Sequence, residues 1–103
     1  MSEREGGIAV MDRQREELKE PPRYSVILLN DDFTPMEFVT GILIGIFRHE
    51  KAKAERIMMD VHEKGRGVAG IYSHEIAETK VVQVMMIAEQ AGYPLQAVME
   101  PEG

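Results

Sequence analysis

The most constraining feature of the sequence is an apolar strand that passes, through one short polar turn, directly into a helix start. Residues 23–29 (RYSVILL) are rich in aromatic and branched apolar side chains, which is typical of a mostly buried strand. Asn30-Asp31-Asp32 then supplies turn-forming residues. Thr34-Pro35-Met36-Glu37 predicts a helix that starts at Pro35, with the Thr34 hydroxyl as its cap and a glutamate at the third position.

The rest of the chain continues as two more helices and two more strands. The first helix is expected to end around Arg48-His49, and the glycines at 65 and 92 each mark a left-handed helix stop. The remaining elements are expected as a helix over residues 51–64, a strand over 67–72, a helix that Ser73 caps, and a strand over 95–99. The order β-α-α-β-α-β favours an α/β sandwich of the α+β type, a small sheet covered by helices on one face.

Length and composition narrow the function classes. The 103 residues, of 11.6 kDa, are enough for one folded domain, which we predict over residues 23–103 after a flexible, charged extension over residues 1–22. Cysteine is absent, which excludes disulfides and thiol nucleophiles. The net charge of −6 disfavours nucleic acid as a partner. Apolar runs fall short of the roughly 20 residues that cross a bilayer, so we expect a cytoplasmic monomer that does not bind membranes.

The densest polar signal lies in the loop before the first helix, over residues 30–35 (NDDFTP). Ordinary turn chemistry with acidic residues near a helix N-terminus explains this composition without any ligand. A site that joins Asp31 and Asp32 to His62, as an acid-base pair or a metal site, is an alternative, but the spacing gives it no support and there is no HExxH motif. We therefore expect no catalytic residue, no metal and no cofactor.

Four segments together resemble the ClpS family of adaptor proteins. They are residues 24–39 (YSVILLNDDFTPMEFV), 57–62 (IMMDVH), 77–80 (AETK) and 93–95 (YPL). The resemblance implies an adaptor, not an enzyme, that binds N-degrons: proteins whose first residue is bulky and apolar, such as Phe, Tyr, Trp or Leu. It further implies that the partner is the N-terminal domain of a ClpA-type AAA+ unfoldase, in the ClpAP protease.

The resemblance also implies a role for each matched position. The free α-amino group of the substrate would be held by Asn30, Asp31 and His62, which fits its cationic state at pH 7 because all three can offer hydrogen-bond acceptors. The pocket for the first side chain would be formed by Asp32, Thr34, Met36, Val39, Met58, Val61 and Leu95. Met36 would act as a gate against Val and Ile, whose side chains widen at Cβ.

The docking face for the unfoldase would be formed by Glu75, Thr79 and Lys80 on the third helix. An exposed charged helix face usually needs no partner to explain it, so this role depends on the resemblance alone. In the family the N-terminal extension serves the transfer of cargo. Phe33 stands where many family members have Tyr, which leaves the strength of docking open. The remaining alternative is an acidic scaffold domain like the C-terminal domain of ribosomal stalk proteins, which would not discriminate between N-terminal residues.

Overall fold

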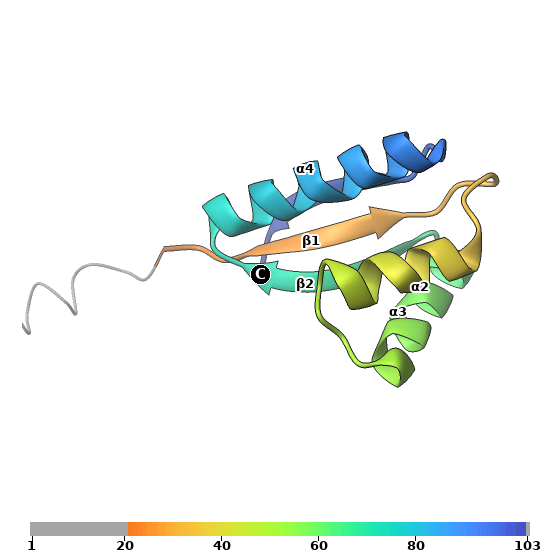
Figure 1. Cartoon of the computed structure of the whole chain (residues 1–103). Helices are drawn as coiled ribbons and strands as arrows, with labels where there is room; N and C mark the ends of the chain where they lie inside the picture. Colours follow the sequence, from red (N-terminus) through yellow and green to blue (C-terminus); the bar gives the residue numbers. More distant parts are fainter. Residues whose placement is uncertain (1–20, 103) are drawn as a thin grey trace, which may run out of the picture.

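The computed structural model describes residues 21–102 and shows three strands and three helices in that part of the chain (Figure 1). The elements are β1 (Tyr24–Leu29), α2 (Met36–Gly45), α3 (Lys51–Lys64), β2 (Arg66–Tyr72), α4 (His74–Ala91) and β3 (Gln96–Pro101). This is the predicted β-α-α-β-α-β order, and the α+β prediction is confirmed. Most of the predicted extension over residues 1–22 lies outside the described residues, so its boundary stays a prediction.

The strands form one antiparallel sheet in the order β2-β1-β3, with the strand from the first apolar run at its centre. Alternation along β1 separates the two faces of the sheet. Val26 and Leu28, both 0% exposed, belong to the core that all three helices cover, whereas Ile27 points to the opposite face. On that opposite face an ion pair of 2.8 Å between Arg66 and Glu100 joins the two edge strands. The helices therefore cover one face, as predicted.

The start of α2 differs from the prediction. The helix begins at Met36 with Pro35 in the cap position, and no side chain forms a cap hydrogen bond. The hydroxyl of Thr34 instead donates to a carboxylate oxygen of Asp31 at 2.7 Å. The bond from the hydroxyl to a carboxylate is charge-assisted. It is therefore stronger than the bond that the hydroxyl would accept from a backbone amide if it capped the helix.

The end of α2 also differs, because the helix stops at Gly45, before the predicted Arg48-His49. The chain then reverses through Arg48, which has a φ of 61°. Two tertiary contacts hold this reversal. The Lys80 ammonium on α4 donates to the Ile46 carbonyl at 2.7 Å, and the His49 ring donates to the Ala69 carbonyl on β2.

The other element boundaries lie close to their predicted places. Gly65 and Gly92 end α3 and α4 in the left-handed conformation, with φ of 87° and 84°. Ser73 occupies the cap position of α4 but makes no side-chain cap bond. The strand β2 starts one residue earlier than expected, and β3 covers residues 96–101 in place of 95–99.

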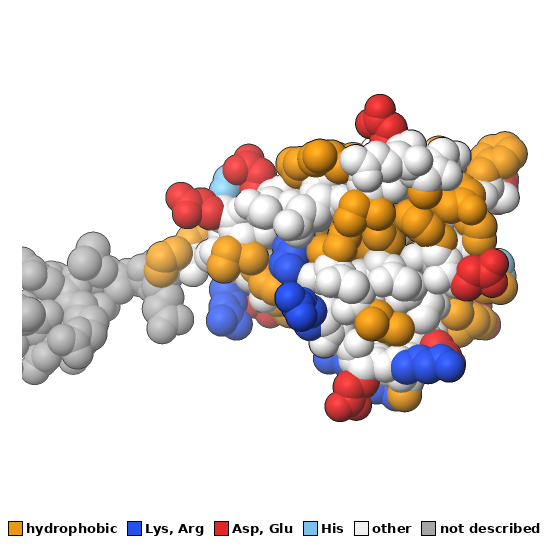
Figure 2. Space-filling model, viewed as in Figure 1, with side chains coloured by type: hydrophobic (Ala, Val, Ile, Leu, Met, Phe, Trp, Pro, Cys, Tyr) orange, Lys and Arg blue, Asp and Glu red, His pale blue; other side chains and the backbone are white. Residues whose placement is uncertain are grey.

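The exposed surface includes an apolar groove between α2 and α4. Apolar side chains gather between these two helices on the face that Figure 2 shows. Residues lining the groove include Phe38, Ile42, Ile46 and Ile87. None of the described helices is both long and apolar enough to cross a membrane.

Candidate functional site

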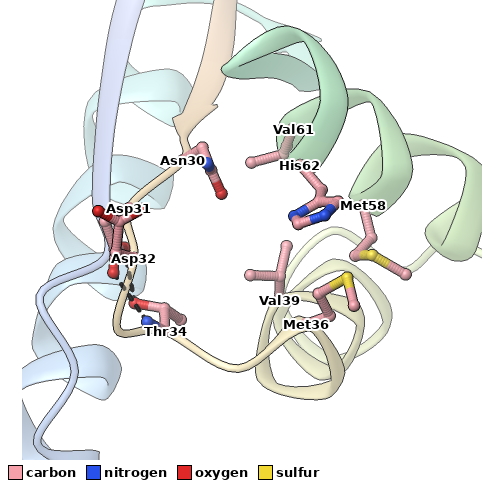
Figure 3. Close-up of a pocket in the computed structure, with 9 residues that line it drawn as sticks. All are labelled: Asn30, Asp31, Asp32, Thr34, Met36, Val39, Met58, Val61 and His62. Atoms are coloured by element: carbon pink, nitrogen blue, oxygen red, sulfur yellow. Dashed lines mark hydrogen bonds between the residues drawn. The ribbon is translucent and has the colours of Figure 1, made fainter.

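A cavity of about 190 Å³ lies where the end of β1 meets the two helices α2 and α3. Its wall comes from the loop after β1, the first turns of α2 and the second half of α3 (Figure 3). The lining residues are Asn30, Asp31, Asp32, Thr34, Met36, Val39, Met58, Val61 and His62. The volume is below the roughly 300 Å³ at which pockets for drug-sized ligands begin, so the cavity has the size for one side chain.

The loop on the polar side of the cavity is organised by the Asp31 carboxylate. One of its oxygens accepts the backbone amides of Phe33 and Thr34, at 2.8 and 2.7 Å, and the other accepts the Thr34 hydroxyl at 2.7 Å. Burial acts to raise the pKa of Asp31, but the hydrogen bonds from Thr34 and Phe33 outweigh it and hold the pKa below its ordinary value of 3.8. Asp31 therefore stays ionised well into acid and fixes the loop.

Two further polar side chains face each other across the opening. Asn30 comes from the end of β1 and His62 from the last turn of α3, and both project into the space between these elements (Figure 3). Both residues are exposed. The backbone amide of Asn30 donates to the Gly65 carbonyl at 2.9 Å, and this bond ties the polar loop to the end of α3. This backbone bond fixes the spacing between the polar loop and the end of α3.

The other side of the cavity is apolar. Val39 and Val61 are 6% and 2% exposed and form the buried part of this wall, while Met58 is half-buried. Met36, in the first turn of α2, is 46% exposed and lies near Met58 at the rim (Figure 3). The cavity therefore combines polar atoms on one side with an apolar recess on the other.

The structure brings together nine of the ten residues that the sequence nominated for substrate contact, all except Leu95. Leu95 is 2% exposed and lines a different depression, between the end of α4 and the start of β3. Every residue that lines the cavity was named from the sequence. The signal was the family resemblance that the loop motif and the MxxVH stretch carry, and on α3 this spacing puts Met58, Val61 and His62 on one side of the helix.

The three residues proposed for docking lie on α4, which contributes no lining residue to the cavity. Glu75 and Thr79 are exposed, and the Thr79 hydroxyl donates to the Glu75 carbonyl at 3.1 Å. Lys80 is half-buried, with its ammonium 5.9 Å from the Phe47 ring centroid and 5.8 Å from that of Tyr72, in addition to its bond to the Ile46 carbonyl. Lys80 thus has a structural task that the sequence did not indicate.

The alternative of a metal site at Asp31, Asp32 and His62 finds no support in the geometry. Over residues 21–102, three or more His, Asp or Glu side chains do not gather anywhere in an arrangement that suits a metal ion.

The fold and the cavity define a class: a small α+β binding domain whose site pairs hydrogen-bonding groups with a recess for one apolar side chain. The family model for the ATP-dependent Clp protease adaptor protein ClpS matches residues 19–98. The chain belongs to the ClpS family of Clp protease adaptors.

Curated relatives and a solved structure agree with this assignment. The ATP-dependent Clp protease adapter protein ClpS of Burkholderia cenocepacia (strain HI2424) is 53% identical over 91 residues, which cover 88% of each chain. The ClpS of Burkholderia mallei (strain SAVP1) is 52% identical over 92 residues, covering 89% of this chain and 88% of the relative. The structure of Agrobacterium tumefaciens ClpS2 bound to L-phenylalaninamide matches with a TM-score of 0.78 and 42% identity, over 81% of this chain and 100% of that one.

Proposed function

We propose that this protein binds the free α-amino group and the bulky apolar first side chain of N-degron substrates, and delivers them to a ClpA-type AAA+ unfoldase. The observation that carries the proposal is the cavity itself, which places Asn30, Asp31 and His62 beside an apolar recess. The Agrobacterium ClpS2 relative was solved with L-phenylalaninamide, which has both a free amine and an aromatic side chain.

Recognition of the amine requires acceptors, because an α-amino group with a pKa of about 7.7 to 8.0 is largely cationic at pH 7. Asn30 offers its side-chain carbonyl, and His62 accepts through an unprotonated ring nitrogen. Asp31 already accepts three hydrogen bonds from its own loop. A carboxylate has roughly four acceptor positions, so about one remains for the ammonium, and its negative charge acts over the whole opening.

The apolar recess selects the first side chain. Val39, Val61 and Met58 provide apolar walls, and the cavity volume of about 190 Å³ accommodates Phe, Tyr, Trp or Leu as the sole buried group. Met36 stands at the rim and is the residue that a branched Cβ would meet. Together, charge-assisted hydrogen bonds of about 1.5 to 3 kcal/mol each and about 1.5 to 3 kcal/mol of side-chain burial, less the cost of association, give a dissociation constant near 1 μM.

Delivery depends on a second surface, on α4. Glu75 and Thr79 are exposed there and free to meet another protein, and Lys80 adds a positive charge at the edge of the same surface. Because α4 does not line the cavity, a substrate and an unfoldase domain can occupy the protein together.

The proposal is tested by fluorescence anisotropy with peptides that differ only in residue one. The wild-type protein should bind Phe, Tyr, Trp or Leu peptides with a dissociation constant near 1 μM and Val, Ile or Ala peptides at least about tenfold more weakly. Replacing Met36 by Ala should improve binding of Val and Ile peptides by about tenfold, because the gate is removed, and should leave Phe binding within about threefold.

The outcome that contradicts the proposal is equal binding of Leu and Ala peptides, which is the behaviour expected of an acidic scaffold domain. Asp31→Ala serves as the companion variant. It should weaken all bulky peptides alike, because it acts on the amine and on the loop and not on the side-chain recess.

A further inference from the structure

Gly67, at the start of β2, has no side chain at the point where α3 packs against the sheet. A Cβ built at this position would lie 2.8 Å from the Val61 Cγ2 atom, 3.1 Å from the Ile57 carbonyl oxygen and 3.3 Å from the Val61 amide nitrogen. The first distance is shorter than a real carbon-carbon contact, so one of the two groups would have to move. Gly67 thus permits a closer approach of α3 to β2 than any other residue would.

The helix side of this contact is a wall of the substrate cavity. Val61 lines the cavity and is 2% exposed, and its Cγ2 methyl packs on the bare backbone of Gly67. The same stretch of chain also anchors the opposite wall, because the carbonyl of Gly65 accepts the backbone amide of Asn30 at 2.9 Å. Residues 65–67 therefore join the two sides of the cavity.

We propose that Gly67 is a specificity-determining residue that sets the position of Val61 and hence the depth of the recess for the first side chain. The inference rests on the proposed function and deepens it. With only hydrogen at position 67, the Val61 methyl sits back against the sheet and leaves the recess deep. A methyl group at position 67 drives Val61 toward the cavity, where the loss of space affects the largest guests most.

The test is Gly67→Ala, assayed with peptides that begin with Trp, Phe or Leu. The variant should weaken Trp binding by roughly tenfold more than Leu binding, with Phe between them. The matched control is Gly92→Ala, at the end of α4 and away from the cavity. Its added Cβ would meet no atom within 4 Å, but its φ of 84° makes the substitution strained. It should lower the melting temperature and leave the ratio of Trp to Leu affinities unchanged.

A second variant separates displacement of Val61 from general damage. In a Val61→Ala background the methyl that meets the new Cβ is gone, so adding Gly67→Ala should leave the Trp to Leu ratio unchanged within about twofold. The contacts of the new Cβ with the Ile57 carbonyl oxygen and the Val61 amide nitrogen, at 3.1 and 3.3 Å, remain in the double variant, but the shortest contact is gone. The double variant should therefore lose less stability on adding Gly67→Ala than the wild type does. An equal loss of stability in the two backgrounds, or an equal weakening of all peptides by Gly67→Ala, overturns the proposal.

A measurement without peptide tests the role of Gly67 separately from the proposed binding of N-degrons. Methyl NMR spectra should show the Val61 and Val39 resonances shifted by Gly67→Ala and not by Gly92→Ala. Unmoved Val61 methyls overturn the role of Gly67 even if the wild type binds N-degron peptides. Failure of the wild type to distinguish a free from an acetylated Phe peptide rejects the proposed function instead.

Discussion

Asp31 combines a structural task with the task we propose for it in binding. Its carboxylate accepts two backbone amides and one hydroxyl from Phe33 and Thr34, so it shapes the loop that presents Asn30. This explains why the sequence predicted a capping role for Thr34 that the structure does not show. Both Asp31 and the helix amides are local partners for a threonine hydroxyl, and only the fold decides between them.

The lowered pKa of Asp31 predicts an acid-dependent loss of stability. A carboxylate whose pKa is lower in the folded than in the unfolded protein stabilises the fold above its ordinary pKa of 3.8, and this stabilisation disappears as the pH falls through the folded value. In urea unfolding, Asp31→Asn should cost about 1 kcal/mol at pH 7. The difference between the two proteins should be constant above about pH 5 and shrink below about pH 4. A difference that grows in acid contradicts this role.

The residues that line the cavity could be predicted from the sequence. The contacts that the fold makes behind the cavity wall could not. The family resemblance, carried by the loop motif and by the segments on α2 and α3, nominated all nine lining residues. It nominated Leu95 as well, which the structure buries between α4 and β3, outside the cavity lining. Gly67 gave no signal, because its importance comes from a helix that packs on it from elsewhere in the chain.

At the scale of the elements, α2 is held at its C-terminal end by a contact with α4. The Lys80 ammonium donates to the Ile46 carbonyl at 2.7 Å and lies above the rings of Phe47 and Tyr72. The start of the same helix carries Met36 and Val39, which line the cavity. We therefore expect the orientation of α2, and with it one wall of the site, to depend on Lys80.

Replacing Lys80 by Met tests this dependence, because Met keeps an apolar stem and removes the charge and the donor. The free energy of unfolding should fall by about 1 to 2 kcal/mol, measured by urea denaturation. The control is Lys64→Met. Lys64 pairs with Asp60 at 3.4 Å with both side chains well exposed, so its loss should cost less than about 0.5 kcal/mol. Equal losses would show that Lys80 is only a surface charge.

The ends of the three helices differ in how well local sequence predicts them. Gly65 and Gly92 end α3 and α4 as expected, because the left-handed stop is a property of glycine itself. The end of α2 at Gly45 came earlier than expected. The chain after it is held by Lys80 and by the bond of His49 to Ala69, which are tertiary contacts that local sequence does not encode.

At the scale of the whole molecule, the fold follows from one central strand. The strand β1 pairs with both others, and the three helices cover the face that carries Val26 and Leu28 (Figure 1). The sequence predicted the element order and the one-sided cover. It did not predict the strand order β2-β1-β3, because pairing partners depend on how the helices return the chain to the sheet. The cavity lies where the end of β1 meets α2 and α3, so the whole fold positions it.

The central claim is that one cavity holds a free α-amino group and an apolar side chain at the same time. Isothermal titration of L-phenylalaninamide and of its N-acetyl derivative tests it most directly, since the two compounds share the side chain and differ in the amine. We predict measurable binding of the free amine and a loss of at least about a hundredfold on acetylation, because the charge-assisted hydrogen bonds are removed and bulk is added. Equal affinity for the two compounds would contradict the claim.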